Sequence, residues 1–308
     1  MKIAFVFSGQ GAQYPSMFHD LCQSNDHVKA VFDLADRTLG RSVSSLCFDG
    51  KQEDLNLTHN TQPCVLAADL AAGEALLGAG IKPDAVAGFS LGEYAALTIA
   101  GVIAKEDVFP LVQLRADAMQ KAVPAGEGAM AAVVGLSSDA VAALCARVTD
   151  GYVIAANFNS PAQTVISGTA KGVAAASALA QEAGAAVMPL KVSAPFHCEL
   201  MKPAADILDA AIAKLSFVAP SIPVYMNVTA TPLPSADSAK ELLVRQAYSP
   251  VQWVQTVRNM YDDGIDTFIE CGPGKTLSGL IKKTLKGCDV RIMRTENCET
   301  LQKTLSNL

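Results

Sequence analysis

A serine between two glycines is the first feature of the sequence that could carry out chemistry. Residues 88–92 read Gly-Phe-Ser-Leu-Gly, after a short apolar run and before a stretch without helix breakers. In a G-x-S-x-G pattern, a sharp strand-to-helix turn exposes the serine hydroxyl above the sheet, and glycines permit the close backbone approach. The helix N-terminus favours negative charge that develops nearby. The pattern predicts that Ser90 is a nucleophile.

A serine nucleophile needs a base, and the chain has only four histidines. His19, His27 and His59 lie in polar stretches, where we expect surface or structural roles. His197 lies in a predicted loop, the kind of segment in which catalytic residues concentrate. We therefore expect His197 to be the base. Spacing alone does not identify an acidic third member.

The elements that must position these residues alternate between strands and helices. The patterns predict strands at 2–7 and 85–88, helices at 62–78, 91–99, 106–122 and 199–215, and a last strand at 266–271. Such an alternation is typical of an α/β fold with a mostly parallel sheet covered on both faces.

Residues 124–195 follow a different order of elements. Strands are predicted at 128–136, 152–158, 163–167 and 185–192, and helices at 138–147 and 169–183. The order β-α-β-β-α-β is the ferredoxin-like plan. We therefore expect 124–195 to be a small ferredoxin-like domain inserted into a large α/β domain formed by 1–123 and 196–308.

Composition excludes several classes of protein. The chain has 308 residues, of which 50% are apolar and 18% charged, with a net charge of −6. This argues against disorder and against nucleic-acid binding as the default function. Its longest uncharged stretches are rich in polar residues or proline, so no membrane span is expected. The eight cysteines have no zinc-site spacing, and we expect free thiols, no metal site and a cytoplasmic location.

Two glycine-containing segments resemble nucleotide-binding loops but lack required residues. Tyr14 stands where the dinucleotide motif that begins at Gly9 needs glycine or alanine. The Gly-Lys-Thr at 274–276 lacks the earlier glycine of a phosphate loop, since Ile269 occupies that position. We therefore expect no nucleotide cofactor.

Six blocks, two of which contain Ser90 and His197, carry a family resemblance. In order they are FSGQGAQ at 7–13, GFSLGEY at 88–94, LR at 114–115, ANFNSP at 156–161, PFH at 195–197 and PVQW at 250–253. Over nearly its full length the chain resembles the malonyl-CoA:acyl-carrier-protein transacylases of fatty-acid synthesis. The resemblance implies a hydrolase-like α/β core with an inserted ferredoxin-like domain, a malonyl-serine intermediate and ping-pong transfer without a cofactor.

The resemblance also implies roles for individual residues. Ser90 is similar to the nucleophile that accepts the malonyl group, and His197 to its general base. Gln246 matches the glutamine whose main chain orients that histidine. The backbone N–H groups of Gln10 and Leu91 are implied to form the oxyanion hole.

Other matching positions are implied to bind the acyl group. Arg115 matches the arginine that binds the malonyl carboxylate, although its own sequence context favours a helix-surface arginine that pairs with Asp117 or Glu93. Asn157 and Asn159 match residues near the pocket, and Phe196 fits a pocket narrowed against branched malonyl groups. The sequence departs from the family at Phe89, where histidine is common.

The implied partners are malonyl-CoA and the phosphopantetheine thiol of acyl carrier protein, and we expect the enzyme to be a monomer. Because carrier protein is acidic, a basic docking face is expected. Residues 275–294 hold six basic side chains and one acidic one, and we predict docking at Lys282, Lys283 and Lys286. Two alternatives remain, a serine thioesterase or esterase on a similar core and a free-standing acyltransferase that serves a polyketide synthase.

Overall fold

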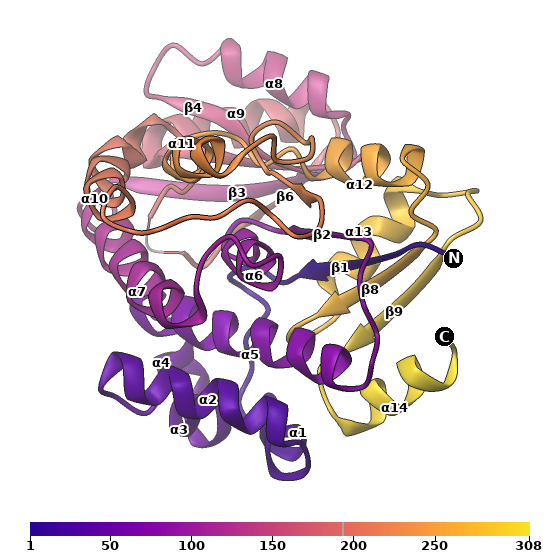
Figure 1. The fold of residues 1–308 in the computed structure, drawn as a ribbon. Helices are drawn as coiled ribbons and strands as arrows, with labels where there is room; N and C mark the ends of the chain where they lie inside the picture. The colour runs from indigo at the N-terminus through magenta and orange to yellow at the C-terminus, as the bar shows by residue number, and fades with distance from the viewer. Residues whose placement is uncertain (193) are drawn as a thin grey trace.

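Two separate sheets organise the chain (Figure 1). The structure is a computed structural model that describes residues 1–192 and 194–308. It is a mixed α/β fold with one parallel and one antiparallel sheet, as the sequence predicted. No helix among the described residues is long and apolar enough to cross a membrane.

The parallel sheet has β1 at its centre. Its strand order is β7-β2-β1-β8-β9. The strands are β1 (Ile3–Phe7), β2 (Ala85–Gly88), β7 (Val224–Tyr225), β8 (Thr267–Cys271) and β9 (Arg291–Thr295). In β1, Phe5 lies opposite Val86 on one side and Ile269 on the other. The strands β1, β2 and β8 are buried throughout, which agrees with helices on both faces of the sheet.

Alternating side chains of β1 divide the core into two layers. Phe5 and Phe7 belong to the layer that contains α5 (Thr58–Gly78), α6 (Gly92–Ile99) and α7 (Lys105–Lys121). Ala4 and Val6 face the opposite layer, which is formed by α12 (Trp253–Asp262) and α13 (Thr276–Thr284). The period of two along the strand therefore fixes which helices lie above and below the sheet.

The structure contains further helices besides those named for the two core layers. They are α1 (His19–Ser24), α2 (Asp26–Leu39), α3 (Val43–Asp49), α4 (Gln52–Leu55), α8 (Ser138–Ala146), α9 (Ala170–Glu182), the short 3₁₀ turn η1 (Glu199–Met201), α10 (Lys202–Ile212), α11 (Ala236–Gln246) and α14 (Cys298–Ser306). The helices α1 to α4 lie below α5 in Figure 1, on the side of the molecule away from α8 and α9.

The second sheet is antiparallel, with strand order β4-β5-β3-β6. Its strands are β3 (Gly128–Val134), β4 (Val153–Ser160), β5 (Gln163–Thr169) and β6 (Ala186–Pro189). With α8 and α9 they follow one another in the predicted β-α-β-β-α-β order. The treatment of 124–195 as a separate ferredoxin-like domain stays a prediction. Hydrogen bonds between β4 and Val251 link this sheet to the rest of the molecule, because Val251 accepts from Phe158 N–H and donates to the Ala156 carbonyl.

One expectation about the elements was wrong. The segment 266–271 was expected to be the last strand, but β9 follows it and pairs with β8 in parallel. The strand β9 lies at the edge of the sheet, and polar residues hold three of its five positions, with mostly half-exposed side chains. Its sequence therefore lacks the continuous apolar run that marks the central strands.

Candidate active site

Ser90 lies at a sharp turn between β2 and α6. Its φ is 53°, in the left-handed region that non-glycine residues seldom adopt. The flanking glycines make the turn possible. A Cβ on Gly88 would lie 1.9 Å from the Gly92 main chain, and one on Gly92 would lie 2.3 Å from the Phe7 carbonyl oxygen. The turn therefore requires glycine on both sides of the serine.

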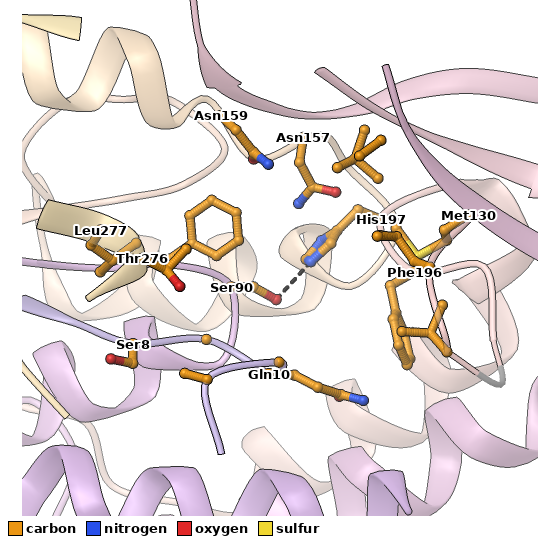
Figure 2. Close-up of a pocket in the computed structure, with 18 of the residues that line it drawn as sticks. Ser8, Gln10, Ser90, Met130, Asn157, Asn159, Phe196, His197, Thr276 and Leu277 are labelled. Carbon is orange, nitrogen blue, oxygen red and sulfur yellow. Dashed lines mark hydrogen bonds between the residues drawn. The ribbon is translucent and has the colours of Figure 1, made fainter. Parts of the chain in front are cut away.

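The imidazole of His197 meets the Ser90 hydroxyl, although 107 positions separate the two residues (Figure 2). The distance from Ser90 Oγ to His197 Nε2 is 2.6 Å. His197 Nδ1 lies 2.9 Å from the main-chain carbonyl oxygen of Gln246. That oxygen can only accept, so Nδ1 carries the proton and Nε2 is left with a lone pair for the serine O–H. A carbonyl thus takes the place that a carboxylate holds in many serine enzymes.

The surroundings of His197 favour the neutral imidazole. Burial and then the positive charge of Arg115 lower its pKa from 6.5 to about 4. At neutral pH the ring is therefore unprotonated and able to accept the serine proton. The backbone of His197 is held by a hydrogen bond from its main-chain N–H to the Ala247 carbonyl, 3.2 Å long.

Two backbone N–H groups beside the serine lack partners. In the described part of the chain, neither Gln10 N–H nor Leu91 N–H makes a hydrogen bond. The loop that contains Gln10 lies next to the serine turn, because Phe89 N–H donates to the Phe7 carbonyl at the end of β1. Such free donors can stabilise an oxyanion on a carbonyl attacked by Ser90.

Arg115 is buried in the same site, with 2% of its surface exposed. Its guanidinium donates to Gln62 Oε1 (2.8 Å) and Gln246 Oε1 (3.0 Å), and lies 3.4 Å from Ser90 Oγ. It also lies over the Tyr94 ring, 5.3 Å from the centroid. Among the described residues it has no ion-pair partner within 4.0 Å, and its Nε has no hydrogen bond. The cation is therefore buried beside Ser90 without an anion in the part of the chain that the structure describes.

The alternative partners expected for Arg115 from its sequence context do not pair with it. Asp117 accepts a hydrogen bond from Gln113 instead. Glu93 is fully buried, and accepts from Asn227 N–H (2.5 Å) and Gln246 Nε2 (3.2 Å). Burial raises the pKa of Glu93 to about 8, while these hydrogen bonds and the charge of Arg115 act in the opposite direction.

Residues that sequence reasoning missed support this site. The Asn227 side chain accepts from Ser90 N–H (2.7 Å) and donates to the Gly88 carbonyl (2.6 Å). Gln62 links Arg115 to the Gln10 side chain, which lies 3.3 Å from Gln62 Nε2. Gln62 ends a run of five polar residues, 58–62, at the start of α5, so its residue type did not set it apart. Asn227 lies in a turn and has no distinguishing signal either.

The serine opens into a cavity of about 260 Å³ (Figure 2). Asn157, Asn159 and Phe196 line it together with Ser90 and His197. Both asparagines come from β4 of the antiparallel sheet, so the two sheets share the cavity. The Oδ1 atom of Asn159 is buried without a hydrogen bond among the described residues, which makes it a free acceptor in the wall.

Phe89 replaces the polar residue that the resemblance leads one to expect beside the nucleophile. Its ring packs edge-on against Trp253, with 5.6 Å between centroids and 77° between planes. Phe89 also lines the cavity. The substitution therefore exchanges a polar contact for an apolar wall and leaves the Ser90–His197 pair intact.

The predicted docking lysines lie outside the cavity. Lys282, Lys283 and Lys286 are exposed in or just after the last turn of α13. Lys282 and Lys286, but not Lys283, border a second hollow of about 660 Å³. The opposite side of α13 contributes Leu277 and Leu280 to the serine cavity. Within the described residues, no group of three His, Cys, Asp or Glu side chains is placed to hold a metal ion.

Comparison with known proteins places this site in a family. Residues 4–303 match the family model of the acyl transferase domain. The chain is 44% identical over 310 residues to the malonyl CoA-acyl carrier protein transacylase of Bacillus subtilis (strain 168), covering 100% of this chain and 97% of the relative.

Solved structures agree with this similarity. The malonyl CoA-acyl carrier protein transacylase of Coxiella burnetii superposes with a TM-score of 0.96 at 39% identity, over 100% of this chain and 98% of that one. A malonyl-transacylase solved in complex with a type II PKS acyl-carrier protein superposes with a TM-score of 0.96 at 38% identity, over 100% of both chains. The chain therefore belongs to the malonyl CoA-acyl carrier protein transacylases, a family of acyltransferases built on the acyl transferase domain.

Proposed function

We propose that this enzyme transfers the malonyl group from malonyl-CoA to the phosphopantetheine thiol of acyl carrier protein, to supply fatty-acid synthesis. The single observation that carries the proposal is the buried guanidinium of Arg115, 3.4 Å from the Ser90 hydroxyl and without an anionic partner among the described residues. A short acyl group with a free carboxylate would pair with this cation. Acetyl would leave it unpaired in a buried site.

In the first half-reaction, Ser90 attacks the thioester carbonyl while its proton passes to His197 Nε2. The oxyanion is held by Gln10 N–H and Leu91 N–H. The C–S bond then breaks, and His197 returns the proton to the leaving thiol of coenzyme A. The malonyl group is left as an ester on Ser90, with its carboxylate on Arg115. Asn157, Asn159 and Phe196 form the surrounding wall.

The second half-reaction uses the same groups in reverse. His197 takes the proton of the phosphopantetheine thiol, whose sulfur attacks the malonyl ester. The serine oxygen leaves and regains its proton from His197. Both halves need only groups of the chain and the two thiols, so the proposed reaction uses no cofactor. The eight unpaired cysteines support a reducing compartment, and we place the enzyme in the cytoplasm.

The carrier protein is proposed to dock at Lys282, Lys283 and Lys286. The support is that α13 presents these lysines on its exposed side and lines the serine cavity with Leu277 and Leu280 on its other side. An acidic partner attracted to this face would arrive next to the cavity opening.

The direct test is to follow labelled malonyl groups from the acylated enzyme. Holo carrier protein should discharge the enzyme and become labelled, whereas apo carrier protein, which lacks the thiol, should not. Rapid release of free malonate without carrier protein would instead indicate a thioesterase. Because a solved relative binds a type II PKS acyl-carrier protein, a polyketide carrier is the second candidate acceptor. The ratio of kcat/KM values for fatty-acid and polyketide carriers distinguishes the two.

A further inference from the structure

Glu93 occupies an unusual position for a carboxyl group. It lies in the first turn of α6, three residues after the nucleophile, and none of its surface is exposed. Burying a carboxyl group is unfavourable unless its hydrogen bonds are satisfied. Both Glu93 oxygens are satisfied, one by Asn227 N–H at 2.5 Å and the other by Gln246 Nε2 at 3.2 Å. One side chain thus joins α6 to the turn that contains Asn227 and to the end of α11, both more than 130 residues further along the chain.

Both of these donors belong to residues that hold the reacting groups. The side chain of Gln246 donates to the Ser90 carbonyl (2.7 Å) and accepts from Arg115 (3.0 Å), while its main-chain oxygen accepts from His197. The Asn227 side chain makes hydrogen bonds to two main-chain groups of the serine turn, Ser90 N–H and the Gly88 carbonyl. The Glu93 side chain therefore makes no hydrogen bond to Ser90 or Arg115, yet it binds a hydrogen-bonding partner of each.

We propose that Glu93 is a positioning residue that fixes Arg115 relative to Ser90 and His197, and thereby sets the preference for malonyl over acetyl groups. The Gln246 amide is the link. Its NH₂ group is drawn to Glu93 and the Ser90 carbonyl, so its oxygen must face the guanidinium. Chains of buried hydrogen bonds of this kind hold a single geometry when every member is satisfied. The inference rests on the proposed function, because it concerns how that reaction selects its acyl group.

The substitution Glu93→Gln tests the idea with little change of volume. In the structure both Glu93 oxygens accept from N–H donors, whereas an amide presents an NH₂ group to one of these donors and leaves it unsatisfied. We expect kcat/KM for acylation by malonyl-CoA to fall roughly 10- to 100-fold, the range for leaving a buried hydrogen-bond donor unsatisfied. The loss should appear in KM as well as kcat. The ratio of kcat/KM for malonyl-CoA to kcat/KM for acetyl-CoA should fall by about tenfold, because Arg115 holds the malonyl carboxylate less well.

A matched control and a double-mutant cycle separate positioning from a purely structural role. Asp69→Asn removes another fully buried carboxyl group, on α5, and should leave the malonyl/acetyl ratio unchanged. In an Arg115→Ala background, Glu93→Gln should no longer alter that ratio, because the residue through which it acts is gone. The thermal midpoint of each variant is measured alongside.

The outcomes are distinct. The proposal would be overturned if the Glu93→Gln enzyme kept the wild-type malonyl/acetyl ratio. It would also be overturned if Glu93→Gln changed that ratio by the same factor in the Arg115→Ala background as in the wild type. If Glu93→Gln does not fold, Glu93→Asp keeps the acceptor with a shorter reach and is scored by the same ratio and cycle. Failure of the wild-type enzyme to prefer malonyl-CoA would refute the proposed function itself, whatever the variants do.

Discussion

At the scale of single residues, two features define the site: the hydrogen bond between His197 and the Gln246 carbonyl, and the buried guanidinium of Arg115. His197 is oriented by the main-chain carbonyl of Gln246, and the hydrogen bond to it raises the pKa of the ring too little to offset the desolvation that lowers it. The positive charge of Arg115 lowers the pKa of His197 further, and Arg115 has no anionic partner among the described residues. The same guanidinium is therefore expected to influence both acyl selection and the pH dependence of the base.

Replacing Arg115 by alanine should weaken malonyl transfer more than acetyl transfer. Removing one partner of a buried charge pair costs about 2–5 kcal/mol, so kcat/KM with malonyl-CoA should fall roughly 30- to 5000-fold. Acetyl-CoA has no carboxylate to lose, and its use relative to malonyl-CoA should rise. Parallel acylation assays with the two thioesters measure this, and an unchanged malonyl/acetyl ratio would refute the role of Arg115.

The pH profile of Ser90 acylation should follow the lowered pKa of His197. The neutral ring is the active base, and it is retained until the pH falls to about 4. We therefore expect the rate to stay level between pH 5 and 7, which covers the ordinary histidine pKa of ~6.5, and to decline only in more acidic buffers. In Arg115→Ala the decline should move to higher pH, since a positive charge that lowers the pKa is removed. An inflection near 6.5 in the wild-type enzyme would argue against the buried neutral base.

The same shift affects folding stability with a definite sign. The unfolded chain binds a proton at His197 near pH 6.5 and the folded chain only near pH 4. The contribution of His197 to the free energy of unfolding is therefore fully present above pH 6.5, and that contribution is lost as the pH falls from 6.5 to 4. Denaturant titrations of the wild type and His197→Gln across this window should show a shallower loss in the variant.

At the scale of elements, two tight turns bring the reacting atoms together. Ser90 and His197 both adopt left-handed backbone conformations, with φ of 53° and 59°. Such conformations cost about 1–3 kcal/mol each and persist only where the surrounding structure enforces them. The serine turn is enforced by packing of β1 against α6, and the histidine turn by the hydrogen bond from its N–H to the Ala247 carbonyl.

Gly92→Ala tests the close approach at the serine turn. The new Cβ would lie 2.3 Å from the Phe7 carbonyl oxygen and 2.6 Å from that of Ser8, both backbone atoms that cannot move alone. We expect a loss of at least about 1–3 kcal/mol in the free energy of unfolding, together with loss of acylation. Gly279→Ala, in the exposed part of α13 with open space around it, is the control and should be neutral or slightly stabilising. Equal stability of the two variants would contradict the packing argument.

Local signals in the sequence predicted the elements better than the site's connections. The strand at Ala85–Gly88 was predicted because an apolar run marks it locally, and the helix predicted at 169–183 is present as α9, Ala170–Glu182, which Thr169 caps. The Gln246 main chain was implied only by resemblance. The hydrogen bonds among Glu93, Asn227 and Gln246 join residues more than 130 positions apart, so neither spacing nor periodicity could predict them.

At the scale of the whole molecule, the uneven charge distribution should matter most in the second half-reaction. The chain carries −6 overall, yet the segment 275–294 is basic and borders the cavity through α13. Steering by such a face raises association rates and weakens as salt is added. Malonyl-CoA loading and carrier-protein unloading should therefore respond differently to changes on this face.

Charge reversal of Lys282 and Lys286 to glutamate tests the docking face. Transfer to carrier protein should slow by roughly tenfold or more at low ionic strength, with the difference shrinking in high salt. Acylation by malonyl-CoA should be unaffected. Lys29→Glu, an exposed lysine on α2, is the control for net charge and should not alter transfer. Equal slowing of both half-reactions would rule out a docking role.

The central claim is that a malonyl group resides on Ser90 between the two half-reactions. It is tested by intact-mass and peptide-mapping mass spectrometry after brief mixing with malonyl-CoA. The account predicts one adduct of about 86 Da on the peptide that contains Ser90, as expected for an acyl-serine intermediate, and its disappearance when holo carrier protein is added. An adduct on another residue, or the same adduct in Ser90→Ala, would contradict it.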